Sequence, residues 1–324
     1  MAFPHTALCA ILITGLSFGA AISQPADYPA QPVRLVVPFP AGGGVDVTSR
    51  LIGEKLRQRW GQPVITENRT GAGGNVGAEN VAASAPDGYS LLYTAAGPLT
   101  INQVLYKKLN YDPASFEPIL RAGFSPMVLA LRKDFPATSV ADLIAFGKAN
   151  PGKANFASQG NATTAHLSLE YFQQLAGAKY THVPYRGTAP AAADLVAGHV
   201  DALFGEIATL LPLHAQGMIR IIAVAADQRL PAIADIPTLQ ELGLAKFRAE
   251  ASFLVAAPAK TPAAITAKLN GDINDVLKMP DVQAKLAAIH VIITGGTPVV
   301  MKQYVAEETV RWTDVIRQAN VKLD

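Results

Sequence analysis

The chain has 324 residues, which is enough to bury a large core and is typical of two domains or one large domain. Half of the residues are apolar and 16% are charged, so the composition excludes a disordered protein and a protein with long charged arms. The net charge of +2 comes from mixed signs without a basic stripe interleaved with aromatic residues, so we expect no nucleic-acid partner.

The N-terminal segment has the features of a secretory signal. Residues 1–23 contain no Asp, Glu, Lys or Arg, and residues 7–22 are almost wholly apolar. The small residues Ala21 and Ser23 offer a cleavage site, and the apolar run is short for a membrane span. We predict a signal peptide over residues 1–23 and export to the periplasm; the alternative is an uncleaved anchor. Cys9 lies inside this signal, so we expect neither disulfides nor thiol catalysis in the mature chain.

The first part of the chain alternates β and α patterns. A β-branched run at residues 33–37 is followed by a Gly-rich turn at 38–44 and by a helical pattern. A second strand at residues 64–66 leads through another Gly-rich loop into a helix at 78–83, and a third strand covers 90–94. This repetition predicts a parallel, doubly wound sheet.

The alternation continues beyond residue 124 and indicates a second α/β unit. The further predicted strands lie at residues 127–131, 154–157, 179–183, 200–204, 219–225 and 252–257. The further predicted helices lie at residues 139–150, 163–176, 189–197, 263–277, 282–288 and 299–320.

Two turns that follow predicted strands are similar. Residues 37–42 read Val-Pro-Phe-Pro-Ala-Gly and residues 183–187 read Val-Pro-Tyr-Arg-Gly, and each leads into a helix. Ligands bind at the carboxyl ends of the strands in open α/β sheets, so both turns are candidates for one ligand site. The alternative is two similar turns without a shared role.

Gly-rich or small polar segments open three predicted helices, at residues 41–44, 71–77 and 158–164. Glycine lets a ligand approach the backbone closely. The free amides and the dipole at a helix start favour a carboxylate or phosphate without any cationic side chain. We therefore predict an anionic ligand.

Several side chains have both a functional and a structural interpretation. Asp46 either orients the first loop, pairs with a cation on the ligand, or only complements the helix dipole. Arg186 either clamps a second carboxylate or is solvated. His166 shares a helix face with Glu170, but no third ligand with metal spacing accompanies them, so a packing or capping role is favoured. Glu206 either counters a ligand ammonium or is an ordinary carboxylate at a helix start.

Common enzymatic motifs are missing from the sequence. No Gly-Lys-Ser/Thr follows a Gly-rich loop, and the glycines at residues 71–77 are spaced one residue too far apart for the dinucleotide fingerprint. We predict a protein that is not an enzyme, with no cofactor and no metal. One rival hypothesis is a periplasmic hydrolase or isomerase with Asp46 or His166 as the base, and another is a ligand-presenting accessory protein of a sensor kinase.

A series of ordered motifs resembles the substrate-binding proteins of tripartite tricarboxylate transporters, the Bug receptors, from about residue 28 to residue 324. The motifs are Tyr28-Pro29, residues 32–43 with Asp46, Glu67-Asn68-Arg69, and residues 71–74, 86–89, 149–153, 182–187, 235–238 and 295–298. The resemblance implies an α/β fold of two lobes, each a mainly parallel sheet flanked by helices, that close on the ligand as a type II Venus flytrap. It implies a first lobe at residues 28–123 plus 252–324 and a second lobe at 124–251.

The resemblance also implies a monomeric periplasmic solute-binding protein that captures a mono-, di- or tricarboxylate or an acidic amino acid. The partners implied are the integral-membrane permease subunits of the transporter. The family usually has a Gly/Ser-rich loop before His166, where this chain has Gln159, Asn161, Thr163 and Thr164, and often an Asp where this chain has Gly205-Glu206. The candidate ligand-binding residues are Phe39, Pro40, Ala41, Gly42, Gly43, Asp46, Gly73, Thr94, Ser158, Gly160, Asn161, Thr163, His166, Tyr185, Arg186, Gly187 and Glu206.

Overall fold

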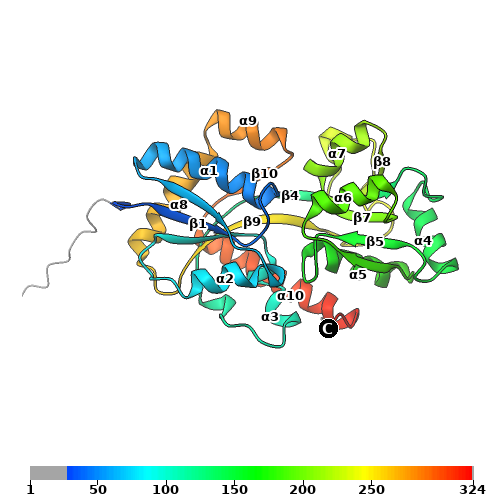
Figure 1. Ribbon diagram of the computed structural model, residues 1–324, viewed down its shortest axis with the longest axis horizontal. Helices are drawn as coiled ribbons and strands as arrows, with labels where there is room; N and C mark the ends of the chain where they lie inside the picture. Colours follow the sequence, from blue (N-terminus) through cyan, green and yellow to red (C-terminus); the bar gives the residue numbers. More distant parts are fainter. Residues whose placement is uncertain (1–27, 323–324) are drawn as a thin grey trace, which may run out of the picture.

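A computed structural model describes residues 28–322, so the predicted signal peptide and Cys9 lie outside the described residues. Two α/β lobes lie side by side along the long axis of the molecule (Figure 1). A ten-stranded sheet runs through both lobes. No helix within residues 28–322 combines the length and the apolar character needed to cross a membrane.

The elements follow the predicted alternation, with their ends shifted by a few residues. The strands are β1 (Val33–Val37), β2 (Val64–Asn68), β3 (Ser90–Thr94), β4 (Glu117–Arg132), β5 (Asn155–Ser158), β6 (Thr181–Pro184), β7 (Ala202–Glu206), β8 (Ile219–Val224), β9 (Glu250–Ala257) and β10 (Ile292–Gly295). The α-helices are α1 (Gly44–Trp60), α2 (Asn75–Ala82), α3 (Asn102–Leu105), α4 (Val140–Ala149), α5 (Thr164–Ala176), α6 (Thr188–Ala197), α7 (Ile207–Ala215), α8 (Ala263–Leu277), α9 (Pro280–Ala288) and α10 (Pro298–Gln318). Helices α3 and α7 and strand β10 are not predicted from the sequence.

In the first lobe, β1 pairs in parallel with β2 and β3, as the sequence predicts. Leu35 faces one core, which α1, α8 and α9 cover with residues such as Ile52, Leu269 and Leu286. Val36 faces the opposite core, to which α2 contributes Val81. Helices on both faces bury the sheet, and the carboxyl end of β1 points toward the second lobe (Figure 1).

In the second lobe, β5 pairs in parallel with β6 and β7. On one face Phe156 stacks on Phe204 with ring centroids 5.3 Å apart, under α4 and α5. The other face packs against α6 and α7 through Leu195 and Leu210. The aromatic core holds the carboxyl ends of β5 and β7 in fixed positions beside the first lobe.

Two long strands, β4 and β9, connect the lobes and pair antiparallel from Glu117–Ala257 to Pro126–Glu250. The predicted parallel pairing therefore holds within each lobe but not for the connecting strands. Only the second-lobe end of β4 is predicted from the sequence, because Pro118, Gly123 and Pro126 interrupt the strand pattern earlier in β4. The register shifts near Pro118 and Gly123, where the strand is irregular.

Helix α10 runs beside the connecting strands and reaches the second lobe (Figure 1). Near its end, Trp312 and Ile316 pack in one apolar cluster with Leu105 of the first lobe and with Ala162 and Leu167 of the second lobe. The C-terminal helix therefore contacts both lobes and the strands between them.

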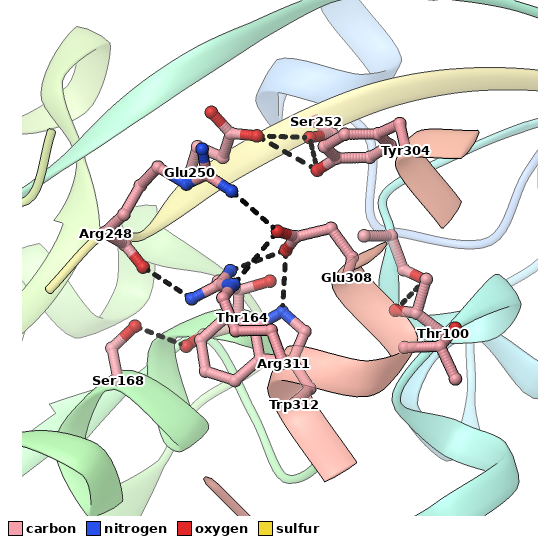
Figure 2. A network of polar contacts seen from close by, with 12 residues as sticks. Thr100, Thr164, Ser168, Arg248, Glu250, Ser252, Tyr304, Glu308, Arg311 and Trp312 are labelled. Carbon is pink, nitrogen blue, oxygen red and sulfur yellow. Dashed lines mark hydrogen bonds and ion pairs between the residues drawn. The ribbon is translucent and has the colours of Figure 1, made fainter. Parts of the chain in front are cut away.

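A network of polar contacts, shown in Figure 2, joins α10 to the start of β9. The Glu308 side chain is 3% exposed and accepts hydrogen bonds from Arg248, Arg311 and Trp312. Tyr304, one turn earlier on α10, donates a 3.0 Å hydrogen bond to Glu250 of β9. These contacts fix α10 against the segment that connects the lobes.

Candidate functional site

The loop between β1 and α1 is held in place by Asp46. The Asp46 carboxylate accepts a 2.9 Å hydrogen bond from the amide of Gly42 and pairs with Arg50. Asn68 donates to Asp46 at 2.9 Å and to the carbonyl of Phe39 at 3.0 Å. Burial acts to raise the pKa of Asp46, but the hydrogen bonds from Arg50, Gly42 and Asn68 hold it below its usual range. Of the alternatives for Asp46, the geometry matches orientation of the loop.

The amino end of α1 lies beside this loop. Gly43 precedes the helix, and no side chain caps it. The first helical hydrogen bond runs from Val47 to the carbonyl of Gly43, so the amides of residues 44–46 have no acceptor within the helix. Pro40, Ala41 and Gly42 are exposed. The helix therefore offers free amides and the positive end of its dipole to an anion.

Glu206 of the second lobe lies against this end of α1. A β-carbon at position 44 would overlap the Oε2 atom of Glu206 and would lie 3.3 Å from the ring of Phe253. Glycine at position 44 therefore permits the two lobes to approach this closely. The last residue of β7 and the first residue of α1 meet at the junction of the lobes.

Glu206 is buried and bonded to one neutral side chain. Its Oε1 accepts a 3.0 Å hydrogen bond from the Nε2 of Gln159, which also lies 2.5 Å from the hydroxyl of Thr188. Burial raises the pKa of Glu206 to about 7, and the hydrogen bond from Gln159 opposes the rise only in part. The carboxyl group is therefore harder to ionise than that of an exposed glutamate.

In the loop from β5 to α5, most of the predicted polar residues form hydrogen bonds within the second lobe. The hydroxyl of Ser158 lies 2.7 Å from the Nε2 of His182 and accepts from the amide of Gly160 at 3.1 Å. Thr163 donates to the carbonyl of Gly160 at 2.7 Å and caps α5 by accepting from the amide of His166. Gly160 has φ +134, which favours glycine. These contacts shape the loop rather than point to a ligand.

His166 has the environment of a packing histidine. Its ring stacks on His182 with centroids 4.2 Å apart, and its Nδ1 accepts a 3.3 Å hydrogen bond from the amide of Ala162. Burial and the nearby His182 lower the pKa of His166 to about 3, and burial lowers the pKa of His182 to about 4. Within residues 28–322, no group of three His, Cys, Asp or Glu residues could hold a metal ion.

The turn after β6 contributes backbone more than side chains. The hydroxyl of Tyr185 donates a 2.6 Å hydrogen bond to Asp194, and Arg186 is exposed without a hydrogen bond or ion pair to any part of the described chain. The amide of Gly187 donates to the carbonyl of Gln159 at 3.1 Å. This bond joins the turn to the loop after β5, so both reach the junction of the lobes together.

The second Gly-rich loop of the first lobe also meets the second lobe. A β-carbon at Gly73 would lie 3.4 Å from the carbonyl oxygen of Asn161 and from the β-carbon of Ala162. Asn161 is exposed. Thr94 is fully buried, and its hydroxyl has no hydrogen-bond partner within residues 28–322. Three of the predicted turns thus converge from the two lobes, around residues 39–44, 73 and 158–163.

Three residues complete this arrangement but are absent from the predicted set: Gly44, Gln159 and Thr188. Gly44 is the third glycine of its run, and Gln159 was noted only as a departure from the usual loop. Nothing in the local sequence pattern pairs either residue with Glu206, because the contact joins positions that are far apart in the chain.

Comparison with known proteins gives consistent matches over nearly the whole chain. Residues 48–321 match the family described as tripartite tricarboxylate transporter family receptor. Protein BugT of Bordetella pertussis is 35% identical over 319 residues, which cover 98% of each chain. These matches confirm the resemblance found in the sequence motifs.

Two solved structures from Rhodopseudomonas palustris have the same fold. Rpa4515, solved with adipate, has a TM-score of 0.87 and 35% identity, covering 91% of this chain and 99% of its own. MatC, solved with bound malate, has a TM-score of 0.84 and 34% identity, and the match covers 89% of this chain and 100% of the MatC chain. The two-lobed binding-protein fold predicted from the sequence is thereby confirmed.

Proposed function

Because the chain belongs to the tripartite tricarboxylate transporter receptor family, we propose that it binds a small carboxylate between its lobes in the periplasm and delivers it to a membrane permease. The lobes are residues 28–123 plus 252–324 and residues 124–251. The observation that carries the proposal is the free amino end of α1, which faces the second lobe across their junction.

A carboxylate fits this end of α1 for a physical reason. The amides of residues 44–46 lack helical acceptors, and Asp46 holds the preceding loop in shape without using these amides. Backbone amides and a helix dipole bind an anion without a Lys or Arg. The dicarboxylates adipate and malate in the structures of Rpa4515 and MatC support the same ligand class for this chain.

Binding between the lobes couples the ligand to closure. Residues 39–46 come from the first lobe, whereas Gln159, Gly187 and Glu206 come from the second. A ligand that contacts both sets stabilises the closed state, because those contacts exist together only when the lobes meet. A permease that recognises the closed form then receives loaded protein in preference to empty protein.

Thermal unfolding with a panel of mono-, di- and tricarboxylates and acidic amino acids tests this proposal. A ligand at a hundred times its dissociation constant stabilises the protein by about 2.7 kcal/mol. Gly43→Asp places a negative charge at the helix start and abolishes the shift, whereas Gly271→Asp, on an open face of α8, retains it. A Gly43→Asp protein that binds normally removes this end of α1 from the site.

Delivery and the absence of chemistry need separate measurements. Uptake of the labelled ligand by cells falls when this protein is deleted and returns when it is restored.

Mass spectrometry of the ligand after incubation with the protein finds it unchanged; turnover that is lost on replacing Asp46 or His166 would instead favour an enzyme.

A further inference from the structure

The carboxyl group of Glu206 lies between the lobes without a cationic partner. Only 9% of the residue is exposed, and its Oε2 atom makes no hydrogen bond or ion pair with any residue from 28 to 322. The groups beside it are Gly44 of α1, Phe253 of β9 and Gln159, which are not titratable. The charged residues near the start of α1, Asp46 and Arg50, are paired with each other.

A buried carboxylate without a compensating charge is unfavourable. The rise in the pKa of Glu206 to about 7, caused by burial, reflects this cost. A cation brought by the ligand would remove the cost and keep the carboxylate ionised. The protein itself places no such cation beside Oε2 within the described residues, although it pairs the buried Glu308 with two arginines.

The position of Oε2 restricts where on the ligand this cation can be. Oε2 lies against Gly44, the first residue of the helix whose free amides face the incoming carboxylate. A group that reaches Oε2 must therefore be attached close to the bound carboxylate. In an α-amino acid, one carbon atom carries both the carboxylate and the ammonium group.

We propose that Glu206 selects ligands that carry an ammonium group on the carbon next to the bound carboxylate, that is, α-amino acids. This inference rests on the proposed function and adds the ligand class to it. A hydroxyl at the same carbon donates one hydrogen bond without charge and is a weaker partner. A carboxylic acid with neither group meets the Glu206 carboxylate at close range and is disfavoured.

Isothermal titration calorimetry at pH 7 with matched ligand pairs tests the selection. The pairs are aspartate and succinate, glutamate and glutarate, and alanine and propionate, with malate as the hydroxy acid. In whichever pair binds, we expect the amino acid to bind at least about tenfold tighter than the plain acid. The affinity for malate should lie between those for aspartate and succinate. Glu206→Gln keeps the size of the side chain and weakens binding of the amino acid by at least about tenfold. The same variant binds the plain acid equally well or better. Glu241→Gln, at an exposed glutamate of the second lobe paired with Arg229, changes neither.

Proton exchange during binding gives an independent readout. An ammonium beside Glu206 lowers the pKa of its carboxyl, so binding of the amino acid releases protons at pH 7. A plain carboxylate raises that pKa and takes up protons. Titrations in buffers of different ionisation enthalpy measure both signs, and Glu206→Gln removes both effects.

The outcomes separate this inference from the proposed function. If Glu206→Gln weakens both members of a pair equally, or if the plain or hydroxy acid binds wild type most tightly, the selection is wrong while carboxylate binding stands. If no member of any pair binds wild type, the selection is wrong, and if no acid of the wider thermal-unfolding panel binds either, the proposed function is wrong as well. Circular dichroism and thermal unfolding establish that Glu206→Gln is folded. Should it fail to fold, Glu206→Asp, which keeps the charge but withdraws it from Gly44, must reduce the preference for the amino member.

Discussion

Gly44 and Glu206 meet where the lobes join, and each determines what the other position allows. Any side chain larger than hydrogen at position 44 would occupy the space of the Glu206 carboxylate. Gly44 also begins α1, so the same residue sits beside the amides that face the ligand. Because Gly44 has no side chain, the second lobe can approach closely and a ligand can still reach the amides at the start of α1.

Gly44→Ala is expected to weaken ligand binding at least about tenfold, because the new methyl group prevents full closure onto Glu206. In a Glu206→Ala background the same change has a small effect, since the clash no longer exists. Calorimetry on the four proteins of this double-mutant cycle measures the coupling. Gly271→Ala on α8, with open space around it, is the matched control. Strictly additive effects would contradict the contact between Gly44 and Glu206.

At the level of residues, the sequence predicted which segments meet at the junction of the lobes better than it predicted the contacts of each side chain. Glu206 meets the start of α1 at the junction of the lobes, and Gly73 meets Asn161 and Ala162 there. The roles of Asp46 and His166 were open, because each depends on partners distant in the chain, Asn68 and His182. For Arg186 both a clamp and a solvated side chain were considered, and its side chain is exposed without a polar contact within residues 28–322.

Among the elements, α10 connects the cores of both lobes with the strands between them. Its buried Glu308 binds Arg248 and Arg311, whose side chains are 38% and 22% exposed. Its Trp312 is buried among residues of both lobes. This helix is therefore placed to resist or permit movement of one lobe relative to the other.

Glu308→Gln is expected to lower the free energy of unfolding by about 2 kcal/mol, less than for a fully buried pair because both arginines remain partly solvated. Glu307→Gln, at the exposed neighbouring position, is the control and changes stability little. Urea unfolding measures both. Equal stability of the two variants would contradict a structural role for the Glu308 network.

The difference in stability between wild type and Glu308→Gln depends on pH through the pKa of Glu308. Burial acts to raise it, but the contacts with Arg311 and Arg248 hold it below its usual range. A lowered carboxyl pKa contributes stability above the unfolded-state pKa and loses it as the pH falls through the folded-state value. The difference in the free energy of unfolding between wild type and Glu308→Gln therefore becomes smaller in acid, below about pH 4. A gap that widened in acid would contradict the ion pairing.

The helices and strands within each lobe could be predicted because their apolar periodicity is local. Elements with weak local signals were missed: α7 contains Pro212, and β10 has only four residues. The antiparallel pairing of β4 with β9 was not foreseen, since it joins segments more than a hundred residues apart and its register is irregular.

For the whole molecule, the two-lobed fold followed from the sequence motifs, and the cores explain why it divides as it does. Two apolar clusters contain only residues 127–251, and two others contain only residues outside that range. A fifth cluster, around Trp312, is shared between the lobes. Each lobe thus has its own pair of apolar clusters, and two strands and one helix join the lobes, which allows them to move as units around a ligand.

The crystal structure of the protein bound to the tightest ligand of the calorimetric panel tests the central claim most directly. The account predicts one ligand carboxylate within hydrogen-bond distance of the amides of residues 44–46 and the adjoining ammonium group beside the Oε2 atom of Glu206. A carboxylate bound away from the start of α1, or an α1 end sealed by protein side chains in the complex, would contradict it.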